Sequence, residues 1–458
     1  MVKISAMEAY KLLPKTNCKE CGEQTCMSFA LKLVGRQAQL KLCPYLTPEN
    51  KKALEEKTTP AVREVLIGSG DKTLAVGGEE VLYRHELKFF TPVKLIIDVS
   101  DAMGEDEVLR RIAFVKSFAV DRMGEMLRLD GLALRCATDD PAKYMAFVKK
   151  VADAYDGPLI LCSFNPAALE AGLTQVAARN PLIYAATKEN WRKVSELAKK
   201  HNVPVVVYSQ NLDELGTIAA SLAYDRIILD PGLATAGKGF GETVNRFVML
   251  RRSAIEGTKE VGYPLMGAPA AVWVGNPDEV AAGTYESIVA GLLMDRFASL
   301  LILHSIEPWS ILPLVTLRQC IYTDPRSEPQ IEAKLYVVGN PKESSPVLVT
   351  TNFSLTYFTV EGDLRRANLD AYVLVINTKG FAVDTAVATG DLSAAKIKEA
   401  LAENKVAEKV KHKKLVIPLF ASHLRGTIED DTGWEVLVGP RDSSGIQKFL
   451  QEKWVVEK

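Results

Sequence analysis

Four cysteines near the start of the chain have the spacing of ligands to an inorganic centre. Cys18, Cys21 and Cys26 fall within nine residues, and Cys43 directly precedes Pro44. Gly22 lets the backbone turn beside the thiols, and a proline after the last cysteine is a feature of iron–sulfur sites. Zinc ribbons commonly carry two C-x-x-C pairs, whereas this sequence has one. The pattern favours an iron–sulfur cluster, with a zinc site or unligated structural cysteines as the alternatives.

Two glycine-containing segments near the other end could hold a ligand. Asn377–Phe381 follows an apolar run, where open α/β sheets place their ligands, and Leu437–Gly445 is a second strand-to-helix junction. Either segment alone could be an ordinary turn. Together with the hydroxyls of Thr350, Thr351 and Thr356, they outline a polar rim around a large cofactor.

The elements that position the cysteines are short. Helical spacing of apolar residues predicts helices over Met7–Leu13 and Cys26–Leu33. The charged stretch from Glu49 to Pro60 ends on a helix stop and is predicted to be a linker. Residues 1–60 therefore form the first predicted domain.

Residues 61–325 alternate between apolar runs and amphipathic stretches. After a predicted hairpin of Thr73–Val76 with Glu86–Phe90, eight apolar runs are each followed by a stretch able to form a helix. Fully apolar strands separated by helices indicate a covered parallel sheet, and eight units suit a closed (β/α)8 TIM barrel. The runs are Val93–Val99, Gly131–Ala137, Pro158–Ser163, Pro181–Ala186, Pro204–Ser209, Arg226–Asp230, Tyr263–Gly267 and Ser299–His304.

Residues 326–458 form the third predicted domain. Strands are expected at Val347–Thr351, Asp370–Asn377 and Leu415–Leu419, and helices at Ser393–Asn404 and Ser444–Trp454. This alternation predicts a small Rossmann-like α/β domain that binds a nucleotide or another cofactor.

The predicted barrel offers no distinctive chemistry of its own. Gly237-Lys-Gly-Phe-Gly241 lacks the G-x-G-x-x-G spacing and is predicted to be a flexible loop. Cys136, Cys162 and Cys320 lie in or beside apolar runs and are expected to be small buried hydrophobes. Polar residues at the predicted strand ends stand where barrel enzymes keep their catalysts, but no pair has a telling spacing. They are Asp98, Asp101, Thr138, Asp139, Asn165, Gln210, Asn211, Asp230 and His304.

Composition narrows the class of protein. The 458 residues are 47% hydrophobic and 25% charged, with a formal net charge of −1, which argues against nucleic-acid binding. No secretory signal is visible, and the apolar window 297–322 is interrupted by His304, Glu307, Pro308 and Arg318, so no membrane span is expected. Seven unevenly spread cysteines indicate a reducing cytoplasm.

The stretch from Leu12 through Cys18, Cys21 and Cys26 to Ala30 resembles the cluster motif of the large (gamma) subunit of the corrinoid iron–sulfur protein. The resemblance extends to Ser345–Tyr357 and to Gly439-Pro-Arg-Asp-Ser443, so it covers both ends of the chain. Lys19 departs from the pattern, where glycine is expected, but it lies between ligands.

The resemblance implies a methyl carrier of the reductive acetyl-CoA (Wood–Ljungdahl) pathway. A base-off cobalt corrinoid (cobalamin) in the C-terminal domain would take a methyl group as Co(I) from a methyl-pterin methyltransferase and pass it to acetyl-CoA synthase. A [4Fe-4S] cluster on Cys18, Cys21, Cys26 and Cys43 would re-reduce Co(II) with electrons from a ferredoxin-type donor. The chain would pair with the small corrinoid iron–sulfur subunit as a heterodimer. The methyl donor could be a folate or a methanopterin.

The resemblance also implies corrinoid contacts. Those expected are Thr350, Thr356, Thr378, Gly380, Phe381, Ala382, Val383, Gly439 and Ser443. The D-x-H-x-x-G signature of histidine-ligated corrinoid proteins is absent, since the nearest match, around His423, has Ala421 in place of the aspartate. Two other functions stay open: a barrel methyltransferase that binds methyl-pterin itself, and a ferredoxin-like electron carrier without corrinoid.

Overall fold

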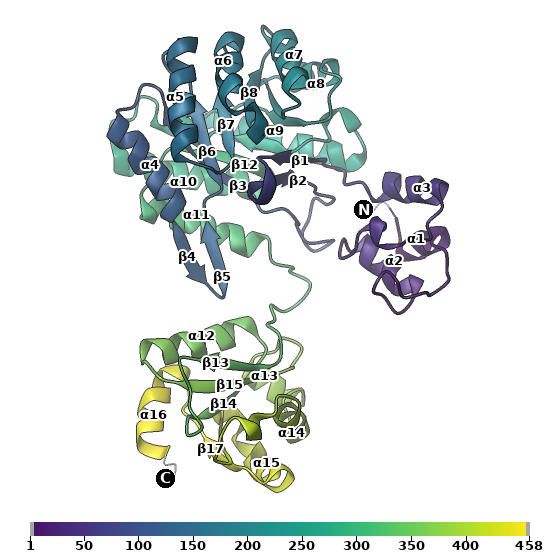
Figure 1. The fold of residues 1–458 in the computed structure, drawn as a ribbon, viewed down its shortest axis with the longest axis vertical. Helices are drawn as coiled ribbons and strands as arrows, with labels where there is room; N and C mark the ends of the chain where they lie inside the picture. The colour runs from purple at the N-terminus through teal and green to yellow at the C-terminus, as the bar shows by residue number, and fades with distance from the viewer. Residues whose placement is uncertain (1–3, 455–458) are drawn as a thin grey trace. The chain divides into compact units, whose positions relative to one another are not determined.

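The computed structural model describes residues 4–454, and Figure 1 shows its helices and strands along the chain. Contacts divide the chain into two compact units. One runs up to Val120 and includes Leu127–Thr323; the other comprises Asp121–Met126 and the chain from Asp324 onward. The three domain ranges predicted from the sequence (1–60, 61–325 and 326–458) stay predictions, and each unit is described by itself.

The N-terminal segment is a small helical cluster. It contains α1 (Ala6–Leu12), α2 (Cys26–Val34), the 3-10 turn η1 (Leu40–Leu42) and α3 (Pro48–Thr58). Capping boxes start the first two helices, because Ser5 and Thr25 accept hydrogen bonds from the backbone N–H three residues on. Ala9, Phe29, Leu33 and Leu54 form the centre of its core.

The predicted linker from Glu49 to Pro60 is wrong, because this stretch forms α3. Thr47 caps the helix by accepting from the N–H of Asn50, and Pro48 occupies its first turn. Leu54 is completely buried against the other two helices. Ala53 and Leu54 are adjacent and are the two residues of the hydrophobic set in α3, so the sequence shows no helical spacing that would reveal its buried side.

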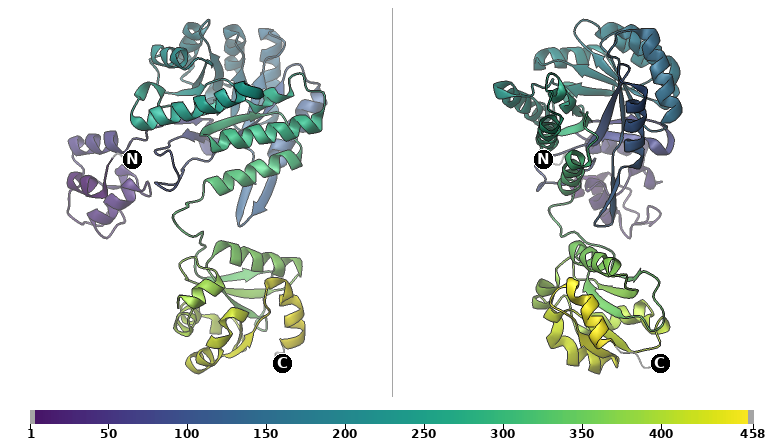
Figure 2. Two further views of the ribbon diagram at one scale, coloured as in Figure 1. Left: turned by 180° about the vertical axis from the view of Figure 1, so that it is seen from behind. Right: turned by 90° about the vertical axis from the view of Figure 1, so that its left-hand side faces the viewer.

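The central region is a closed barrel of eight parallel strands, as predicted. The eight apolar runs all form barrel strands, and helices cover the outside (Figures 1 and 2). The strands are β3 (Lys94–Ser100), β6 (Gly131–Arg135), β7 (Leu159–Cys162), β8 (Leu182–Ala186), β9 (Val205–Tyr208), β10 (Ile227–Asp230), β11 (Leu265–Gly267) and β12 (Ala298–Leu303). The helices are α4 (Glu105–Ser117), α5 (Pro141–Ala154), α6 (Pro166–Val176), α7 (Trp191–His201), α8 (Leu212–Ser221), α9 (Gly237–Glu256), α10 (Glu279–Asp295) and α11 (Pro308–Ile321).

Alternate residues of the strands fill the barrel. Ile96, Ile160, Val206 and Ile228 belong to one interior cluster, which is closed by Val65, Ile67 and Val76 of a hairpin. That hairpin pairs β1 (Glu64–Ile67) with β2 (Leu74–Gly77), so the predicted pairing of residues 73–76 with 86–90 is wrong. Glu86–Phe90 lies outside any strand.

Two further local features differ from the sequence prediction or add to it. The glycine segment 237–241 is the first turn of α9 and not a loop. A second hairpin joins β4 (Ala119–Arg122) to β5 (Glu125–Arg128). Its turn residues Met123 and Gly124 both have positive φ, which matches the right-handed twist of a hairpin.

The C-terminal unit contains a five-stranded sheet in the order β13-β15-β14-β16-β17. Only the edge strand β13 (Leu335–Val338) runs antiparallel to its neighbour. The parallel strands are β14 (Val347–Thr351), β15 (Ala371–Ile376), β16 (Lys414–Ile417) and β17 (Glu435–Val438). This is the predicted α/β architecture.

Helices cover both faces of this sheet. On one face α12 (Ser354–Arg366) and α16 (Ile446–Lys453) pack on Leu348, Val373 and Val416. On the other face α13 (Val383–Ala388), α14 (Ala394–Glu403) and α15 (Arg425–Thr432) pack on Val349, Leu374 and Leu415. Helices on both faces explain why the strands are apolar throughout.

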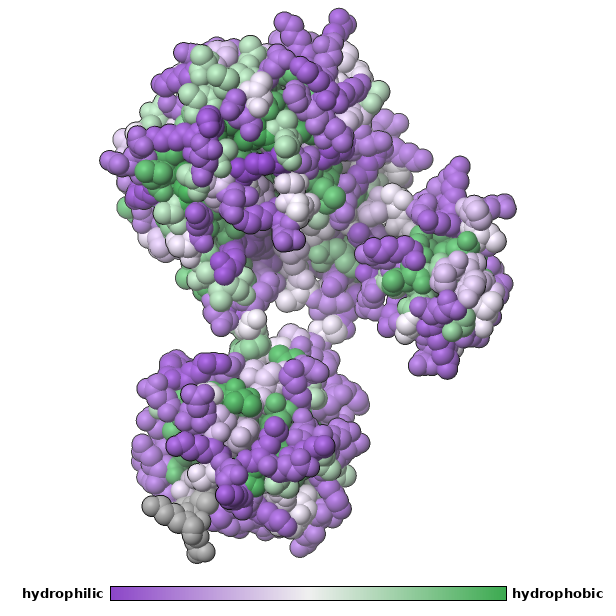
Figure 3. Space-filling model, viewed as in Figure 1, coloured by the Kyte–Doolittle hydropathy of each residue, from purple (hydrophilic) through white to green (hydrophobic). Residues whose placement is uncertain are grey.

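The surface is largely polar, as the purple residues show on the side seen in Figure 3. None of the helices within residues 4–454 combines the length and the apolar composition of a membrane span.

Arg318 of α11 ties that helix to the barrel. It donates hydrogen bonds to Asp130 Oδ2 at 2.5 Å and to the Val93 carbonyl at 3.1 Å, and its side chain is 11% exposed. Arg318→Met removes the cation that pairs with the partly buried Asp130 carboxylate. We expect a loss of about 3 kcal/mol in stability, seen as a lower Tm of the full chain. Arg110→Met is the control, because Arg110 forms an exposed pair with Glu107, and we expect it to cost less than about 1 kcal/mol. Equal Tm values for the two variants would contradict this account.

Candidate cofactor sites

The four cysteines predicted to bind a cluster all lie in the N-terminal helical segment, on three local elements. Cys18 and Cys21 lie in the loop between α1 and α2, Cys26 is the first residue of α2, and Cys43 follows η1. The Asn17 side chain accepts a hydrogen bond of 2.8 Å from the Cys26 backbone N–H, which fixes the loop onto the helix start. A thiolate at this position is stabilised by the helix dipole.

The four thiols are near enough to influence one another. Burial raises the pKa of the Cys43 thiol, and repulsion from Cys21, Cys26 and Cys18 raises it further. Thiols in this condition lose their protons when a metal centre binds. Within residues 4–454, no three side chains of His, Cys, Asp or Glu lie close enough together to hold one metal ion. In a cubane iron–sulfur cluster each cysteine thiolate binds a different iron, and four cysteines are the donor set that such a cluster takes.

A crevice opens in the C-terminal sheet where the strand order reverses. The chain passes from β14 to β15 on one side and then returns to β16 on the other side of β14. β14 and β15 pair at five positions, whereas β14 and β16 pair only at Leu348 and Val416. β14 and β16 therefore separate toward their carboxyl ends, where doubly wound sheets bind ligands.

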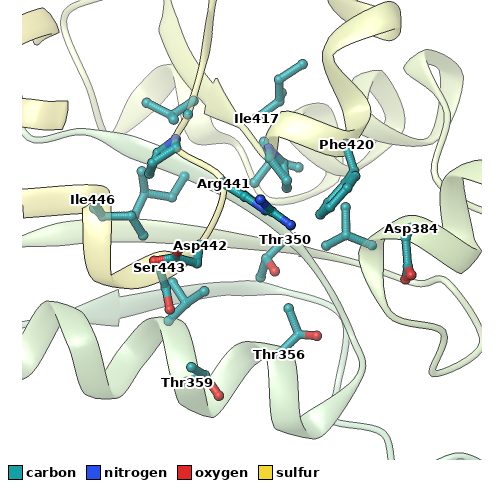
Figure 4. Close-up of a pocket in the computed structure, with 18 of the residues that line it drawn as sticks. Thr350, Thr356, Thr359, Asp384, Ile417, Phe420, Arg441, Asp442, Ser443 and Ile446 are labelled. Carbon is teal, nitrogen blue, oxygen red and sulfur yellow. The ribbon is translucent and has the colours of Figure 1, made fainter.

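A pocket of about 430 Å³ occupies this crevice. Its walls are largely apolar and include the buried side chains of Leu348, Val416 and Ile446 and the exposed ring of Phe420. The hydroxyl-bearing side chains of Thr350, Thr356 and Ser443 face it from β14, α12 and the segment after β17 (Figure 4). An apolar slot with a few polar groups at its rim suits a large flat cofactor that carries amide substituents.

The structure brings together five of the nine residues predicted to contact the corrinoid. Thr350, Thr356, Val383, Gly439 and Ser443 line the pocket. A side chain at Gly439 would lie 3.1 Å from a methyl group of Val416, so glycine keeps this backbone close to the neighbouring strand. The Ser443 hydroxyl donates to the Asp363 carboxylate, which fixes the loop after β17 against α12.

The other four predicted residues, Thr378, Gly380, Phe381 and Ala382, are not among the residues that line this pocket. The first two belong to a tight loop held by Asn352. Its side-chain oxygen accepts from the N–H and the hydroxyl of Thr378 and from the N–H of Gly380. Gly380 has φ of +83°, which favours glycine. These contacts give the loop a structural role.

Phe420, Arg441 and Asp384 are among the pocket-lining residues that the sequence reasoning did not name as contacts. Phe420 belongs to the 3-10 segment η7 (Leu419–Leu424), Arg441 follows β17, and Asp384 is the second residue of α13. Figure 4 shows the Arg441 guanidinium extending into the pocket near Phe420. Arg441 belongs to the Gly439–Ser443 motif of the family resemblance, and its place between two predicted contacts could have indicated that it lies at the pocket. His423 is exposed on η7 and is not among the lining residues.

Polar side chains at the strand ends of the barrel mainly satisfy one another. His304 Nδ1 donates to Asp98 Oδ1 at 2.7 Å, and Arg111 and Arg135 also pair with this carboxylate. Burial opposes ionisation of Asp98, but the His304 hydrogen bond and the two arginines lower its pKa below the usual value. Asp101 accepts from Thr138, and Asn165 donates to Asp139. The cysteine prediction is wrong for Cys320, which is exposed, and Cys136 and Cys162 are partly buried.

The chain thus combines an N-terminal segment with four cysteines, a (β/α)8 barrel and a doubly wound α/β domain that has a pocket at its switch point. Residues 64–450 match the family described as "CO dehydrogenase/acetyl-CoA synthase delta subunit", and residues 13–45 match a family of Fe–S cluster segments. The gamma 1 subunit of the acetyl-CoA decarbonylase/synthase complex of Methanosarcina mazei is 43% identical, with 99% of each chain covered. The gamma subunit from Archaeoglobus fulgidus is 42% identical over 98% of each chain. The chain belongs to this family of acetyl-CoA decarbonylase/synthase gamma subunits.

Among solved structures, dihydropteroate synthase from Xanthomonas albilineans aligns with 57% of this chain and 100% of its own. The TM-score is 0.40 and the identity 16%.

Asp230, at the end of β10, gives the barrel a pH-dependent stability. Burial raises its pKa to about 6, although hydrogen bonds from Gly232 N–H and the Tyr184 hydroxyl oppose the rise. Because the folded pKa lies above the unfolded value, ionisation costs stability as pH rises from about 4 to about 6, by about 3 kcal/mol, and no more above that. Asp230→Asn removes this cost.

We expect the Tm of Asp230→Asn, relative to the unsubstituted chain, to rise between pH 4 and pH 6 and then level off. Asp153→Asn is the control, because the Asp153 side chain is 70% exposed on α5. A difference for Asp230→Asn that stays constant from pH 4 to pH 8 would contradict the assignment.

Proposed function

We propose that this chain is a corrinoid methyl carrier of the reductive acetyl-CoA pathway, in the methyltransferase class, and corresponds to the large subunit of the corrinoid iron–sulfur protein. The observation that carries the proposal is the apolar, hydroxyl-rimmed crevice at the β14/β16 switch point in a chain that also holds four thiols together. When bound, the corrinoid supplies the cobalt that holds the methyl group, and a [4Fe-4S] cluster supplies the electron that restores Co(I).

The pocket residues have separate tasks in this proposal. Leu348, Val416 and Ile446 exclude water from the apolar part of the corrinoid. Thr350 and Thr356 offer hydroxyls to its amide substituents, which orients the ring system. The backbone at Gly439 lies close to Val416 and Ile417 of the neighbouring strand because glycine has no side chain to separate them. A pocket of about 430 Å³ takes part of a corrinoid, so the rest stays accessible to partners.

The proposal takes the corrinoid as base-off, without a histidine from this chain beneath the cobalt. A cobalt that must return to Co(I) gains from the lack of a donor ligand, since Co(I) is already electron-rich. The exposed position of His423 on η7 supports this choice. The four cysteines, Cys18, Cys21, Cys26 and Cys43, would hold the cluster as thiolates, because binding to a cationic core offsets the burial and mutual repulsion that raise the pKa of Cys43.

The proposed partners follow from the two halves of the transfer. A methyl-pterin methyltransferase supplies the methyl group, acetyl-CoA synthase accepts it, and a low-potential ferredoxin in the cytoplasm supplies electrons. The small corrinoid iron–sulfur subunit completes a heterodimer. Family membership in a multisubunit complex supports the existence of partner subunits.

Replacing the rim hydroxyls tests the corrinoid pocket. We expect the double variant Thr350→Val, Thr356→Val to bind cobalamin about 30-fold more weakly, because each of the two lost hydrogen bonds is worth about 1 kcal/mol. Thr359→Val is the matched control: Thr359 also lines the pocket, but its hydroxyl already donates to the Leu355 carbonyl at 2.7 Å. The measurement is anaerobic equilibrium titration of the full chain followed by visible absorbance. Equal affinities for the double variant and the control would contradict the proposed rim contacts.

Replacing one thiol tests the cluster. We expect Cys21→Ser to lose most of the iron and the broad visible absorbance of anaerobically reconstituted protein, because alcohols are poor ligands to iron. Cys320→Ser, an exposed cysteine on α11, should retain both. Iron and zinc are measured together on the same samples. If the unsubstituted chain contains about one equivalent of zinc and no iron, the four cysteines form a zinc site and the proposed cluster is wrong.

A further inference from the structure

Tyr45 lies where two cysteine-bearing loops of the N-terminal segment meet. The first loop, residues 14–25, holds the first two predicted ligands, and the second, residues 40–46, holds the fourth. The Tyr45 hydroxyl donates a hydrogen bond of 2.6 Å to Oε1 of Glu20, which stands between the first two ligands in the sequence. No other hydrogen bond in the described part of the chain joins these two loops. The Tyr45–Glu20 bond therefore links the loop of the first two thiols to the loop of the fourth.

The backbone on either side holds Tyr45 in place. Pro44 and Tyr45 form a turn directly after Cys43, and the proline ring fixes the backbone angle at the start of that turn. The Tyr45 backbone N–H lies beside the Cys43 sulfur. Leu46 then packs on the N-terminal core, and Thr47 caps α3. Tyr45 is thus a firm support, with a ligand on one side of it and a helix start on the other.

The loop that carries Glu20 is held less firmly by its own contacts. Inside it, the Gly22 N–H donates to the Lys19 carbonyl at 2.9 Å, which makes a local turn. Lys19 has φ of +65°, a region that disfavours residues with a side chain, so this turn needs support from outside. Asn17 fixes the end of the loop through the Cys26 N–H, at the start of α2. The Tyr45 hydroxyl supplies the restraint between these points.

A cluster held by all four cysteines needs both loops at a fixed separation. The thiols influence one another, yet within residues 4–454 no three of them lie close enough together to hold one metal ion. A core that binds all four must therefore be enclosed by both loops at once. Local opening of either loop exposes the core to water and to chelators, and a bond that joins the two loops makes such opening rarer.

We propose that Tyr45 is a positioning residue for the cluster: its hydroxyl holds the Glu20 loop against the Cys43 loop and so slows the loss of iron. The inference rests on the proposed function in taking the four cysteines as cluster ligands. It adds a residue that binds no iron and acts through Glu20. Because the acceptor is a carboxylate, the hydrogen bond is stronger than one between neutral groups. Tyr45 is 52% exposed, so the bond matters more for the loops than for the stability of the whole chain.

Removal of the hydroxyl alone tests this role. We expect Tyr45→Phe, in the full-length chain reconstituted anaerobically with iron and sulfide, to release iron to a ferrous chelator about 10-fold faster, because the bond between the loops is lost. Glu20→Ala removes the same bond and should have the same effect. Tyr10→Phe is the matched control, because Tyr10 packs in the same core and contacts Lys15 through its ring. We expect its release rate to equal that of the unsubstituted chain, as measured by the visible absorbance over time.

A conservative variant and a double variant separate positioning from an effect of charge. Glu20→Gln keeps a side-chain oxygen that accepts from Tyr45, so we expect its release rate to stay within about 3-fold of the unsubstituted chain. The double variant Tyr45→Phe, Glu20→Ala should release iron no faster than either single variant, since both substitutions remove one shared bond. Circular dichroism and the Tm confirm that each variant is folded.

Equal release rates for Tyr45→Phe and Tyr10→Phe would overturn the proposal. Additive effects of Tyr45→Phe and Glu20→Ala would also overturn it, because the two residues would then act separately. Glu20→Gln as labile as Glu20→Ala would assign the effect to the charge of Glu20 and not to the bond. If the unsubstituted chain takes up no iron, the proposed cluster is wrong and the role of Tyr45 falls with it. Normal iron uptake with no effect of Tyr45→Phe would refute the role of Tyr45 alone and leave the cluster standing.

Discussion

The separation of β14 from β16 is the constraint on which the proposed chemistry depends. The chain must cross to opposite sides of β14 to build a doubly wound sheet, so neighbouring loops leave the sheet in opposite directions. With pairing reduced to Leu348 and Val416, the carboxyl ends of the strands diverge. The pocket, the threonine rim and the approach of Gly439 all follow from that divergence, and a fully paired sheet would fill the same space with backbone.

Several charged side chains of the barrel are buried or partly buried and are paired within the chain. Asp98, Asp130 and Glu286 are each held by arginines or by backbone N–H groups, so most ionised groups near the strand ends have partners within the chain. Burying a charge without such a partner would cost several kcal/mol. Glu286 of α10 and Arg318 of α11 both take part in these internal contacts and do not face solvent.

Much of the fold was predictable because its signals are local. Eight apolar runs between helices identified the barrel, and cysteine spacing identified the first candidate site. What escaped was tertiary in origin. Leu54 is the buried residue that holds α3. The strand that pairs with β2 is β1, which comes before it in the chain, whereas the sequence pattern predicted a later partner. Phe420 reaches the pocket from a 3-10 segment, which has no periodic sequence pattern. The corrinoid contacts expected in the loop 378–382 stay predictions; the Asn352 side chain, which sequence spacing does not reveal, holds the first part of this loop.

Metal and corrinoid content of the chain tests the central claim most directly. The full-length chain is reconstituted anaerobically with iron, sulfide and cobalamin, desalted, and analysed for iron and cobalt alongside its visible spectrum. The account predicts about four irons and about one cobalt per chain, with the spectrum of a corrinoid that lacks a nitrogen lower ligand. Iron without retained cobalt would contradict it and leave the chain as an electron-transfer protein.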